Sequence, residues 1–561
     1  MAGVRPFSVV HRSADVADAT DGELDVLVIG CGATGAGVAL DAASRGMSVA
    51  VVDRGDLASG TSSKSSKLIH GGLRYLEQYE FGLVHESVVE RELLQRLAPH
   101  LVRPMDFVFP IFRDTARVRL MRLGLTTYDV FAGVRNVRRH ERISAERAIQ
   151  MAPALAGSDL ERAYLYGDCA TDDARLVLAV SKAARRFGAV VLTYTQADQL
   201  LFGTDERVCG AVVTDRLTGA SYELRARHVV NATGVWVESL MQQEDPARPL
   251  VVQPSKGVHL VVPDDRVPLL NASILLPSGQ GDGRSMFAIP WGRQTILGTT
   301  DTAYDGPLDG ASVEQQDLDY ILTATNALFR SDLVEDDVVG GWAGCRPLLR
   351  GAGGTMSDLS RRHTLIEGKG GLLTITGGKL TTFRKMAEDV VDRVAKRDDR
   401  RAPCRTDRIP LGCRRPYATV LAEMEQAVAA VGLDREHAEL LVRQHGEAAA
   451  DVLSLAADDP ALAEHLSPAA VHVAAEVVWA VRREGAATLD DVFARRTRLA
   501  LRARDAALPS ARLAAGLMAK EIGEDDAWAG AQVAAYTDAV RRERGVLGLP
   551  APHATSPSPT V

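Results

Sequence analysis

Residues Ser62 to Glu80, SSKSSKLIHGGLRYLEQYE, combine hydroxyl, ammonium, imidazole and guanidinium groups around a pair of glycines. So many hydrogen-bond donors beside a flexible backbone are unusual for a surface loop. An imidazole can take up a proton near neutral pH, because its ordinary pKa is about 6.5. An arginine nearby can stabilise negative charge on a reacting oxygen. The segment is therefore a candidate for part of an active site.

A dinucleotide-binding pattern precedes this segment. The run DVLVIGCGATGAGVALDAASRGMSVAVVDRG is typical of a strand, a glycine turn, a helix and a second strand. Gly30, Gly32 and Gly35 follow the spacing G-x-G-x-x-G, which permits a tight turn and a close approach of the backbone to a pyrophosphate. Asp53 ends the second strand, where it can accept a hydrogen bond from a ribose hydroxyl. An acid at this position disfavours a 2′-phosphate, so NAD and FAD remain.

Three further segments favour FAD. TSSKSSK begins a few residues after Asp53, where a ribityl chain and isoalloxazine would extend away from the adenosine. VVNATG, residues 229–234, is a second signature of two-dinucleotide-fold flavoproteins, although alone it is equally an ordinary buried strand. LLTITGGKLTTFRKMAEDVVDRV, residues 372–394, predicts a strand and then a helix whose N-terminus would stabilise negative charge on a reduced flavin. The predicted cofactor contacts are Gly30, Gly32, Gly35, Asp53, Thr61, Ser62, Ser65, Ser66, Lys67, His70, Gly377, Gly378, Leu380 and Thr381.

Length and pattern predict how the chain is divided. A chain of 561 residues is too long for one compact core. Strand-like and helical patterns alternate over residues 23–400, which is typical of an α/β protein with several sheets. Residues 401–548 are mostly Ala-rich and helical, and predict a separate all-α domain. Residues 1–22 are expected to form a flexible arm and residues 549–561 a disordered tail.

Composition excludes several classes of function. A net charge of −8 and a pI near 6.0 provide no general attraction to nucleic acid. The 6 cysteines never form C-x-x-C, so neither a zinc site nor a disulfide framework is expected. No apolar run suits a signal peptide or reaches the roughly 18 residues of a membrane span. We therefore expect a cytoplasmic protein that is soluble or lies on a membrane surface.

Eight segments follow one another in order between about residues 24 and 400: SSKLIHGGLRYLEQYEF, HLVRPMDFVFP, GDCATDDARLVLA, VNATGVW, KGVHLVV, IPWGRQTILGTTDTAYDG, GCRPLL and TGGKLTTFRKMAE. In these the chain resembles the FAD-dependent glycerol-3-phosphate dehydrogenases. The resemblance implies a D-amino-acid-oxidase-type fold, in which a Rossmann-like FAD domain is interleaved with an antiparallel substrate domain and followed by a helical cap domain. It implies oxidation of sn-glycerol 3-phosphate to dihydroxyacetone phosphate, with electrons passed through FAD to a membrane quinone.

The resemblance also implies roles for individual residues. His70 is expected to be the base that takes the proton of the C2 hydroxyl, with a role as a flavin ligand alone as the alternative. Arg74 is expected to stabilise the alkoxide, or else to be a structural ion-pair partner.

Substrate binding is expected to depend on positive charge. Arg346 and Arg361 would meet the phosphate through their guanidinium forks, although Arg362 stands beside Arg361. Tyr75 and Lys379 would complete the contacts with the substrate.

The sequence also suggests partners for the protein and two alternative functions. Residues 112–133 are basic and amphipathic, so they suit an anionic membrane surface on the inner face of the cytoplasmic membrane, or are an ordinary surface helix. The resemblance makes a homodimer plausible. One alternative is an oxidase of the same fold that reduces oxygen. The other is a non-catalytic flavin-binding scaffold, which would need none of the residues proposed for catalysis.

Overall fold

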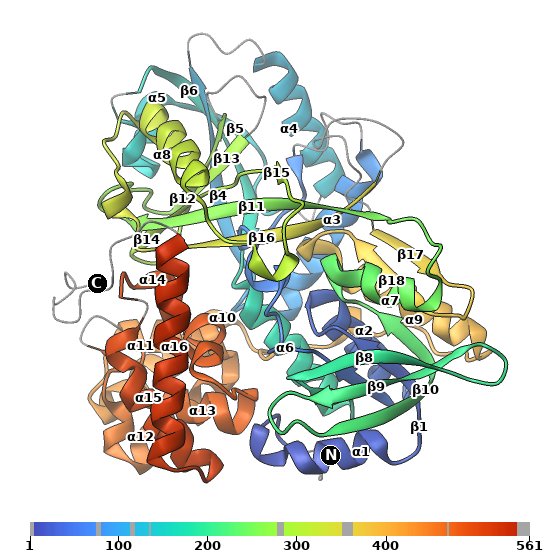
Figure 1. Cartoon of the computed structure of the whole chain (residues 1–561). Helices are drawn as coiled ribbons and strands as arrows, with labels where there is room; N and C mark the ends of the chain where they lie inside the picture. The colour runs from blue at the N-terminus through green and yellow to red at the C-terminus, as the bar shows by residue number, and fades with distance from the viewer. Residues whose placement is uncertain are drawn as a thin grey trace.

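Two β-sheets and a helical domain build the molecule (Figure 1). The structure is a computed structural model, and no side chain is described for residues 118–123, 132, 276, 277, 545 and 546. It describes residues 5–73, 80–112, 118–133, 136–156, 158–277, 285–350, 363–467, 471–505 and 507–546.

Within the described ranges the first sheet has eight strands, and it carries the dinucleotide-binding pattern. Its five central strands are parallel, as expected for buried runs of valine, isoleucine and leucine that are covered by helices. Three helices pack together beside it, namely α2 (Ala33–Ser44), α6 (Asp173–Arg186) and α9 (Phe383–Arg397). The strands are β17 (His363–Glu367), β18 (Leu373–Gly377), β10 (Ser221–Asn231), β1 (Glu23–Ile29), β2 (Val49–Val52) and β7 (Val190–Leu192), with β9 (Val208–Asp215) and β8 (Thr195–Phe202) branching from β10.

The second sheet has ten strands and is almost entirely antiparallel, as expected for a substrate domain of this fold. The one parallel pair among its strands in the described part of the chain joins β12 to β4, a departure from the expected antiparallel arrangement. The strands are β3 (Leu68–Ile69), β4 (Arg103–Phe112), β5 (Glu141–Ser144), β6 (Leu160–Ala170), β11 (Val252–Pro263), β12 (Ala272–Pro277), β13 (Ser285–Pro290), β14 (Gln294–Gly298), β15 (Thr302–Ala303) and β16 (Gly340–Leu349).

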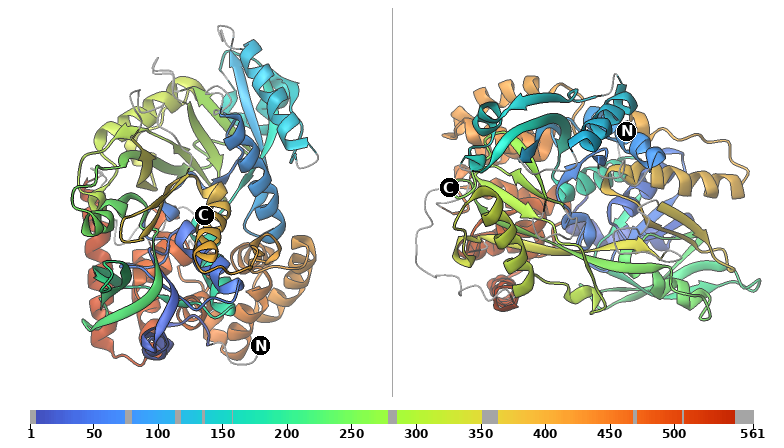
Figure 2. Two further views of the ribbon diagram at one scale, coloured as in Figure 1. Left: turned by 90° about the vertical axis from the view of Figure 1, so that its right-hand side faces the viewer. Right: turned by 90° about the horizontal axis from the view of Figure 1, so that it is seen from above.

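Among the described residues, further helices lie beside the two sheets, and the all-α C-terminal region has a hydrophobic core of its own. Figure 1 and the left view of Figure 2 place α4 (Val118–Ala132, cyan) at the opposite end of the molecule from that helical domain. The helices along the sheets are α3 (Phe81–Leu97), α4 (Val118–Ala132), α5 (Ala145–Met151), α7 (Val237–Glu244) and α8 (Gln315–Phe329). The domain contains α10 (Tyr417–Val428), α11 (Arg435–His445), α12 (Ala449–Asp458), α13 (Ala474–Glu484), a π-helical turn (Asp491–Arg496), α14 (Leu499–Arg502), α15 (Ala511–Ile522) and α16 (Asp526–Val546).

The N-terminal region differs from the expected flexible arm. Helix α1 (Arg12–Thr20) packs beside the first sheet, where Arg12 Nε lies 2.7 Å from Asp215 Oδ2. The Ser8 hydroxyl donates to the carbonyl of Val481 at 2.8 Å, and Phe7 is buried. The expectation is therefore wrong for the described residues 5–22, because contacts with distant parts of the chain order them. The expected tail, residues 549–561, lies outside the described residues.

The strands predicted from the sequence are confirmed, and so is the fold class. The limits of the helical domain, residues 401–548, stay a prediction. Within the described ranges, no helix is both long and apolar enough to cross a membrane.

Candidate active site

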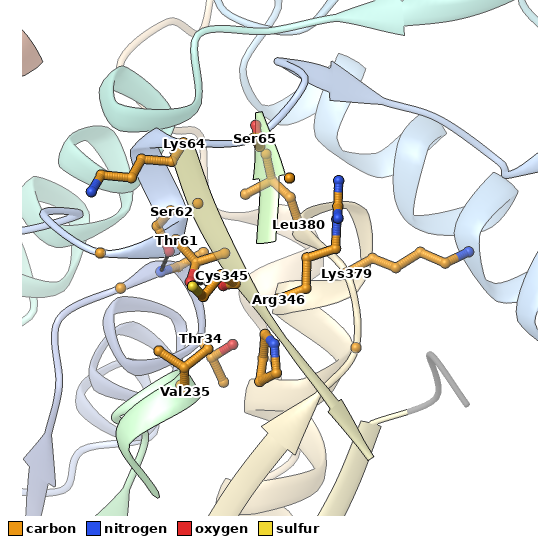
Figure 3. A pocket seen from close by; sticks show the side chains of 18 of the residues that line it. Thr34, Thr61, Ser62, Lys64, Ser65, Val235, Cys345, Arg346, Lys379 and Leu380 are labelled. Atoms are coloured by element: carbon orange, nitrogen blue, oxygen red, sulfur yellow. Dashed lines mark hydrogen bonds between the residues drawn. The ribbon is translucent and has the colours of Figure 1, made fainter. Parts of the chain in front are cut away.

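A cavity of about 680 Å³ is lined by residues of both sheets (Figure 3). Ligand pockets in proteins commonly measure roughly 300–1,000 Å³, so this cavity is large enough for an extended ligand. Its walls come from segments that are far apart in sequence, including the glycine turn after β1, the loop after β2, and strands β11 and β16.

The glycine turn has the geometry that close approach to a phosphate requires. Gly30 has φ +103°, and a Cβ atom there would lie 2.6 Å from the carbonyl oxygen of Ala232. Gly32 precedes the first residue of α2, and the backbone N–H of Ala33 donates to Ser62 Oγ at 2.9 Å. The positive end of the helix dipole is thus directed at the cavity, which suits a pyrophosphate. Gly35 does not line the cavity but lies behind the turn, where a Cβ atom would meet Gly30 O at 1.8 Å.

Asp53 lines the cavity and also holds the turn together. Its carboxylate accepts hydrogen bonds from the backbone N–H groups of Cys31 (2.7 Å) and Gly55 (3.0 Å). Burial raises the pKa of Asp53 to about 6, against the opposing effect of these two N–H groups. Each carboxylate oxygen has a second lone pair, so contact with a ribose hydroxyl remains possible.

Most of the predicted loop contacts face the cavity. Thr61, Ser62, Ser65 and Ser66 all line it. The Thr61 hydroxyl donates to the carbonyl of Cys345 at 2.7 Å, which ties the loop to β16.

Lys67 does not lie where the sequence predicted. Its ammonium group is buried away from the cavity, 2.9 Å from Asp173 Oδ1 and 3.1 Å from the carbonyl oxygen of Ser63. The expected cofactor contact by this side chain is therefore corrected. The physical reason is the ion pair with Asp173, which holds the ammonium group in the interior.

His70 also lines the cavity, and its backbone is held from two sides. The backbone N–H of His70 donates to Thr381 Oγ1 at 3.1 Å. The next residue, Gly71, donates through its N–H to Tyr128 Oη (3.1 Å) and Asp168 Oδ1 (3.2 Å). The imidazole therefore projects from a constrained backbone.

Behind His70 lies a buried polar cluster that the sequence did not reveal. Arg91 Nη1 lies 2.6 Å from Asp168 Oδ1, and Tyr128 Oη donates to Asp168 Oδ2 at 2.9 Å. Burial and the neighbouring carboxylate raise the pKa of Tyr128 well above its ordinary value, so the phenol stays neutral. The segment GDCATDD contains Asp168, but no local signal pairs it with an arginine of α3.

The predicted substrate-binding residues within the described ranges reach the cavity. Arg346 lines it from β16, and its guanidinium donates to Thr299 Oγ1 (2.9 Å) and lies 3.2 Å from Asp301 Oδ1. Lys379 also lines the cavity, and its ammonium group donates to Ser87 Oγ at 3.2 Å. Both cations are half-buried, which strengthens their attraction for an anion.

The strand-to-helix segment after β18 forms another wall. Gly377 and Gly378 have φ +77° and +73° and turn the chain from β18 towards α9. Leu380 and Thr381 follow in a short 3₁₀ turn, and all four residues line the cavity. The predicted strand, glycine pair and helix are confirmed as elements.

Two further cavity residues carry buried nitrogen atoms that have no hydrogen-bond partner among the described residues. They are Trp236 Nε1 and His259 Nδ1. Burial, with smaller contributions from Arg346 and Lys67, lowers the pKa of His259 well below its ordinary value, so its ring is neutral. Trp236 lies within the quoted VNATGVW, but its indole was not predicted to make a contact. Orphaned buried groups of this kind fit a cofactor that supplies their partners.

Three predicted residues cannot be placed. Arg74, Tyr75 and Arg361 lie outside the described residues, as does Arg362. Their predicted roles stay predictions.

A sheet with the glycine turn and a mostly antiparallel sheet line this cavity together, an arrangement typical of dinucleotide-binding proteins. Residues 25–384 match the family described as FAD dependent oxidoreductase. Residues 404–529 match the C-terminal domain of alpha-glycerophosphate oxidase.

Similar proteins show to which family of FAD-dependent oxidoreductases the chain belongs. The chain is 40% identical to Glycerol-3-phosphate dehydrogenase 2 of Mycobacterium tuberculosis, over 93% of this chain and 88% of that one. It is 36% identical to the Aerobic glycerol-3-phosphate dehydrogenase of Bacillus subtilis, over 88% and 90% of the two chains. The solved glycerol-3-phosphate dehydrogenase from Bacillus halodurans complexed with FAD matches with a TM-score of 0.79 and 31% identity, over 95% of this chain and 98% of that one. The chain therefore belongs to the FAD-dependent glycerol-3-phosphate dehydrogenase family, and its cofactor is FAD.

Proposed function

We propose that this protein oxidises sn-glycerol 3-phosphate to dihydroxyacetone phosphate and delivers the electrons to a quinone in the membrane. The relatives, which are glycerol-3-phosphate dehydrogenases, support the substrate. The observation that carries the proposal is that His70, Arg346 and Lys379 line the same cavity as the glycine turn, although they are far apart in sequence. A site for a phosphorylated alcohol needs a base and positive charge close together.

Oxidation of the substrate removes the proton of the C2 hydroxyl and a hydride from C2. FAD, when bound, supplies the hydride acceptor. His70 would take the hydroxyl proton, because an imidazole is the side chain best matched to proton transfer at neutral pH. Its backbone hydrogen bond to Thr381 fixes the position from which it acts.

Phosphate recognition would fall to Arg346 and Lys379. The contacts of Arg346 with Thr299 and Asp301 fix the plane of its guanidinium, which reduces the entropy lost when it binds a phosphate. Lys379 adds a second positive charge in the same cavity. The contact with Asp301 keeps the guanidinium of Arg346 oriented.

A membrane surface would be reached through α4. Val130 of this helix is 72% exposed and Phe81 of α3 is 43% exposed, and the rings of Phe81 and Phe131 lie 6.0 Å apart. Leu125 and Tyr128 on the same helix are buried and attach it to the protein. These exposed apolar side chains support peripheral binding to the inner face of the cytoplasmic membrane. A homodimer, suggested by the family resemblance, is part of the proposal and is tested by light scattering.

An anaerobic titration of the FAD-loaded protein with sn-glycerol 3-phosphate tests the proposal. We expect the visible flavin absorbance to fall and to return when a soluble quinone analogue is added. Glycerol without phosphate is the matched control, and should leave the absorbance unchanged at the same concentration. An unchanged absorbance with sn-glycerol 3-phosphate would contradict the substrate and favour a non-catalytic flavin-binding scaffold.

An oxygen-reducing oxidase is the second candidate, since the matched C-terminal family is described from an alpha-glycerophosphate oxidase. Oxygen uptake in the presence of substrate and absence of quinone separates the two. Slow oxygen uptake, together with rapid oxidation of the substrate once quinone is added, supports the dehydrogenase. Rapid uptake with stoichiometric hydrogen peroxide supports the oxidase.

A further inference from the structure

Arg498 connects the helical domain to the cofactor-binding part of the molecule. It follows the π-helical turn Asp491–Arg496, and its side chain is only 1% exposed. Its Nε donates to Asp172 Oδ2 at 3.0 Å, and its Nη2 forms an ion pair with Asp173. Both acids lie where α6 begins, beside the first sheet.

Asp173 holds the loop that lines the cavity. Its Oδ2 accepts two hydrogen bonds from Ser65, one from the backbone N–H (3.1 Å) and one from the hydroxyl (2.8 Å). Its Oδ1 accepts a hydrogen bond from Lys67 Nζ at 2.9 Å. Ser65 lines the cavity and is labelled in Figure 3. A continuous chain of contacts thus runs from Arg498 through Asp173 to the cavity wall.

The four charges of this cluster depend on one another. Lys67 and Arg498 carry two positive charges, and Asp172 and Asp173 carry two negative charges. Burial and the nearby Arg498 lower the pKa of Lys67 to about 8, while the two aspartates act in the opposite direction. Removal of one member of such a buried set leaves an uncompensated charge, which is strongly unfavourable.

The backbone at both ends of the cluster is constrained. Lys67 has φ +56° and Arg498 has φ +67°, in the left-handed region that residues other than glycine rarely adopt. Such conformations persist where the surroundings fix them, and they are frequent at functional sites. Here the ion pairs with Asp172 and Asp173 supply that constraint.

Another buried contact docks the helical domain without touching the loop. Arg175 Nη1 lies 2.7 Å from Glu484 Oε2, with side chains 3% and 1% exposed. Neither residue contacts Ser65 or Lys67 in the described part of the structure, and neither lines the cavity. This pair is therefore a matched control for domain docking.

We propose that Arg498 is a positioning residue for FAD: through Asp173 it fixes Ser65 and the cavity loop, and so couples docking of the helical domain to cofactor binding. No cavity-lining residue within the described ranges belongs to the helical domain, so that domain can act on the cavity only indirectly, and the contact of Arg498 with Asp173 is the route that reaches Ser65. The helical domain, which contributes no residue to the proposed reaction, would thereby support the binding of FAD.

Dissociation of FAD measures the coupling directly. The FAD-loaded protein is diluted, and the rise in flavin fluorescence gives the dissociation constant. Arg498→Lys keeps the charge but replaces the planar guanidinium, which meets Asp172 and Asp173 through Nε and Nη2, by a single ammonium group, so we expect the dissociation constant to rise about tenfold or more. Glu484→Gln should lower the melting temperature but change the dissociation constant by less than about twofold. Equal weakening by both variants would overturn the proposal, because Arg498 would then act only through docking.

A second variant tests the chain of contacts from the loop side. Ser65→Ala removes one hydrogen bond to Asp173 from a half-buried residue, and it decides the matter if Arg498→Lys does not fold. In the FAD-loaded Ser65→Ala protein we expect faster hydrogen exchange at residues 491–502 than in the unchanged protein, because coupling between two sites is reciprocal. Unchanged exchange there would overturn the proposal. In the double variant the two effects on FAD dissociation should be less than multiplicative, and independent effects would count against it.

Discussion

The guanidinium of Arg346 lies directly against the backbone of Gly257. A Cβ atom at Gly257 would lie 2.1 Å from Arg346 Nη2, a distance that no real contact allows. The two residues belong to β11 and β16, which pair antiparallel with Ser255 opposite Arg346. The orientation of a predicted substrate residue therefore depends on the absence of a side chain on the neighbouring strand.

Gly257→Ala is expected to displace Arg346 and to raise KM for sn-glycerol 3-phosphate by roughly 10–100-fold, the effect of losing one charge-assisted hydrogen bond. Arg346→Lys should have a similar effect, because a single ammonium cannot replace the planar fork. Steady-state kinetics checks both. Gly310→Ala is the control, since its nearest contact would be Pro307 at 3.7 Å. A normal KM in Gly257→Ala would show that Arg346 does not bind the substrate.

His70→Gln tests the proposed base. We expect kcat to fall by about 10²- to 10⁴-fold, the usual contribution of a general base, with a smaller change in KM. Stopped-flow measurement of flavin reduction isolates the chemical step. The flavin spectrum and the FAD dissociation constant should stay close to those of the unchanged protein. Weak FAD binding with near-normal reduction would instead identify His70 as a flavin ligand.

Asp168→Asn is expected to lower both the free energy of unfolding and kcat. The substitution removes the buried ion pair between Arg91 and Asp168, which costs roughly 3–5 kcal/mol of the free energy of unfolding. It also loosens the contact to the Gly71 N–H, so kcat should fall. Tyr128→Phe keeps the ion pair and should cost only about 1–3 kcal/mol. Denaturant unfolding measures the free energy of unfolding of both variants. Equal losses in the two would show that the Arg91–Asp168 ion pair does not contribute more than the hydrogen bond of Tyr128.

We expect the free energy of unfolding to fall in acid, because a largely buried carboxyl pairs with the helical domain. That carboxyl belongs to Asp172, which meets Arg498. Burial tends to raise the pKa of Asp172, but Arg498 and Lys67 outweigh it and hold that pKa at about 2. A carboxyl whose folded pKa lies below its unfolded value stabilises the fold above the unfolded pKa of about 3.9, and this contribution is lost as the pH falls towards 2.

Melting temperature measured against pH checks this prediction. In the unchanged protein it should decline steeply between about pH 4 and pH 2. Asp172→Asn should have a lower melting temperature at neutral pH and a shallower decline in that window. Parallel curves for the two proteins would contradict the assignment. The pair of Arg175 and Glu484 contributes in the same direction, because Arg175 and Lys182 outweigh burial and hold the pKa of Glu484 well below its ordinary value.

The sequence by itself determined those features that depend only on residues close together in the chain. The spacing of Gly30, Gly32 and Gly35, the apolar strands around them and Asp53 predict a dinucleotide turn, because φ, close packing and strand periodicity depend on neighbouring residues. The glycine pair before α9 was predictable for the same reason. Motif order over some 380 residues predicted the family and the cofactor.

Only the tertiary structure decided which charged side chains form buried ion pairs with one another. Lys67 stands among predicted cofactor residues, yet it pairs with Asp173 in the interior. Arg91 in α3 and Arg498 just before α14 look like ordinary charges in the sequence, and only packing buries them against acids 77 and 325 residues away. The N-terminal helix is ordered by Asp215 and Val481, which its own sequence does not indicate. Burial and pairing of a charge depend on residues distant in the chain, so a local pattern does not encode them.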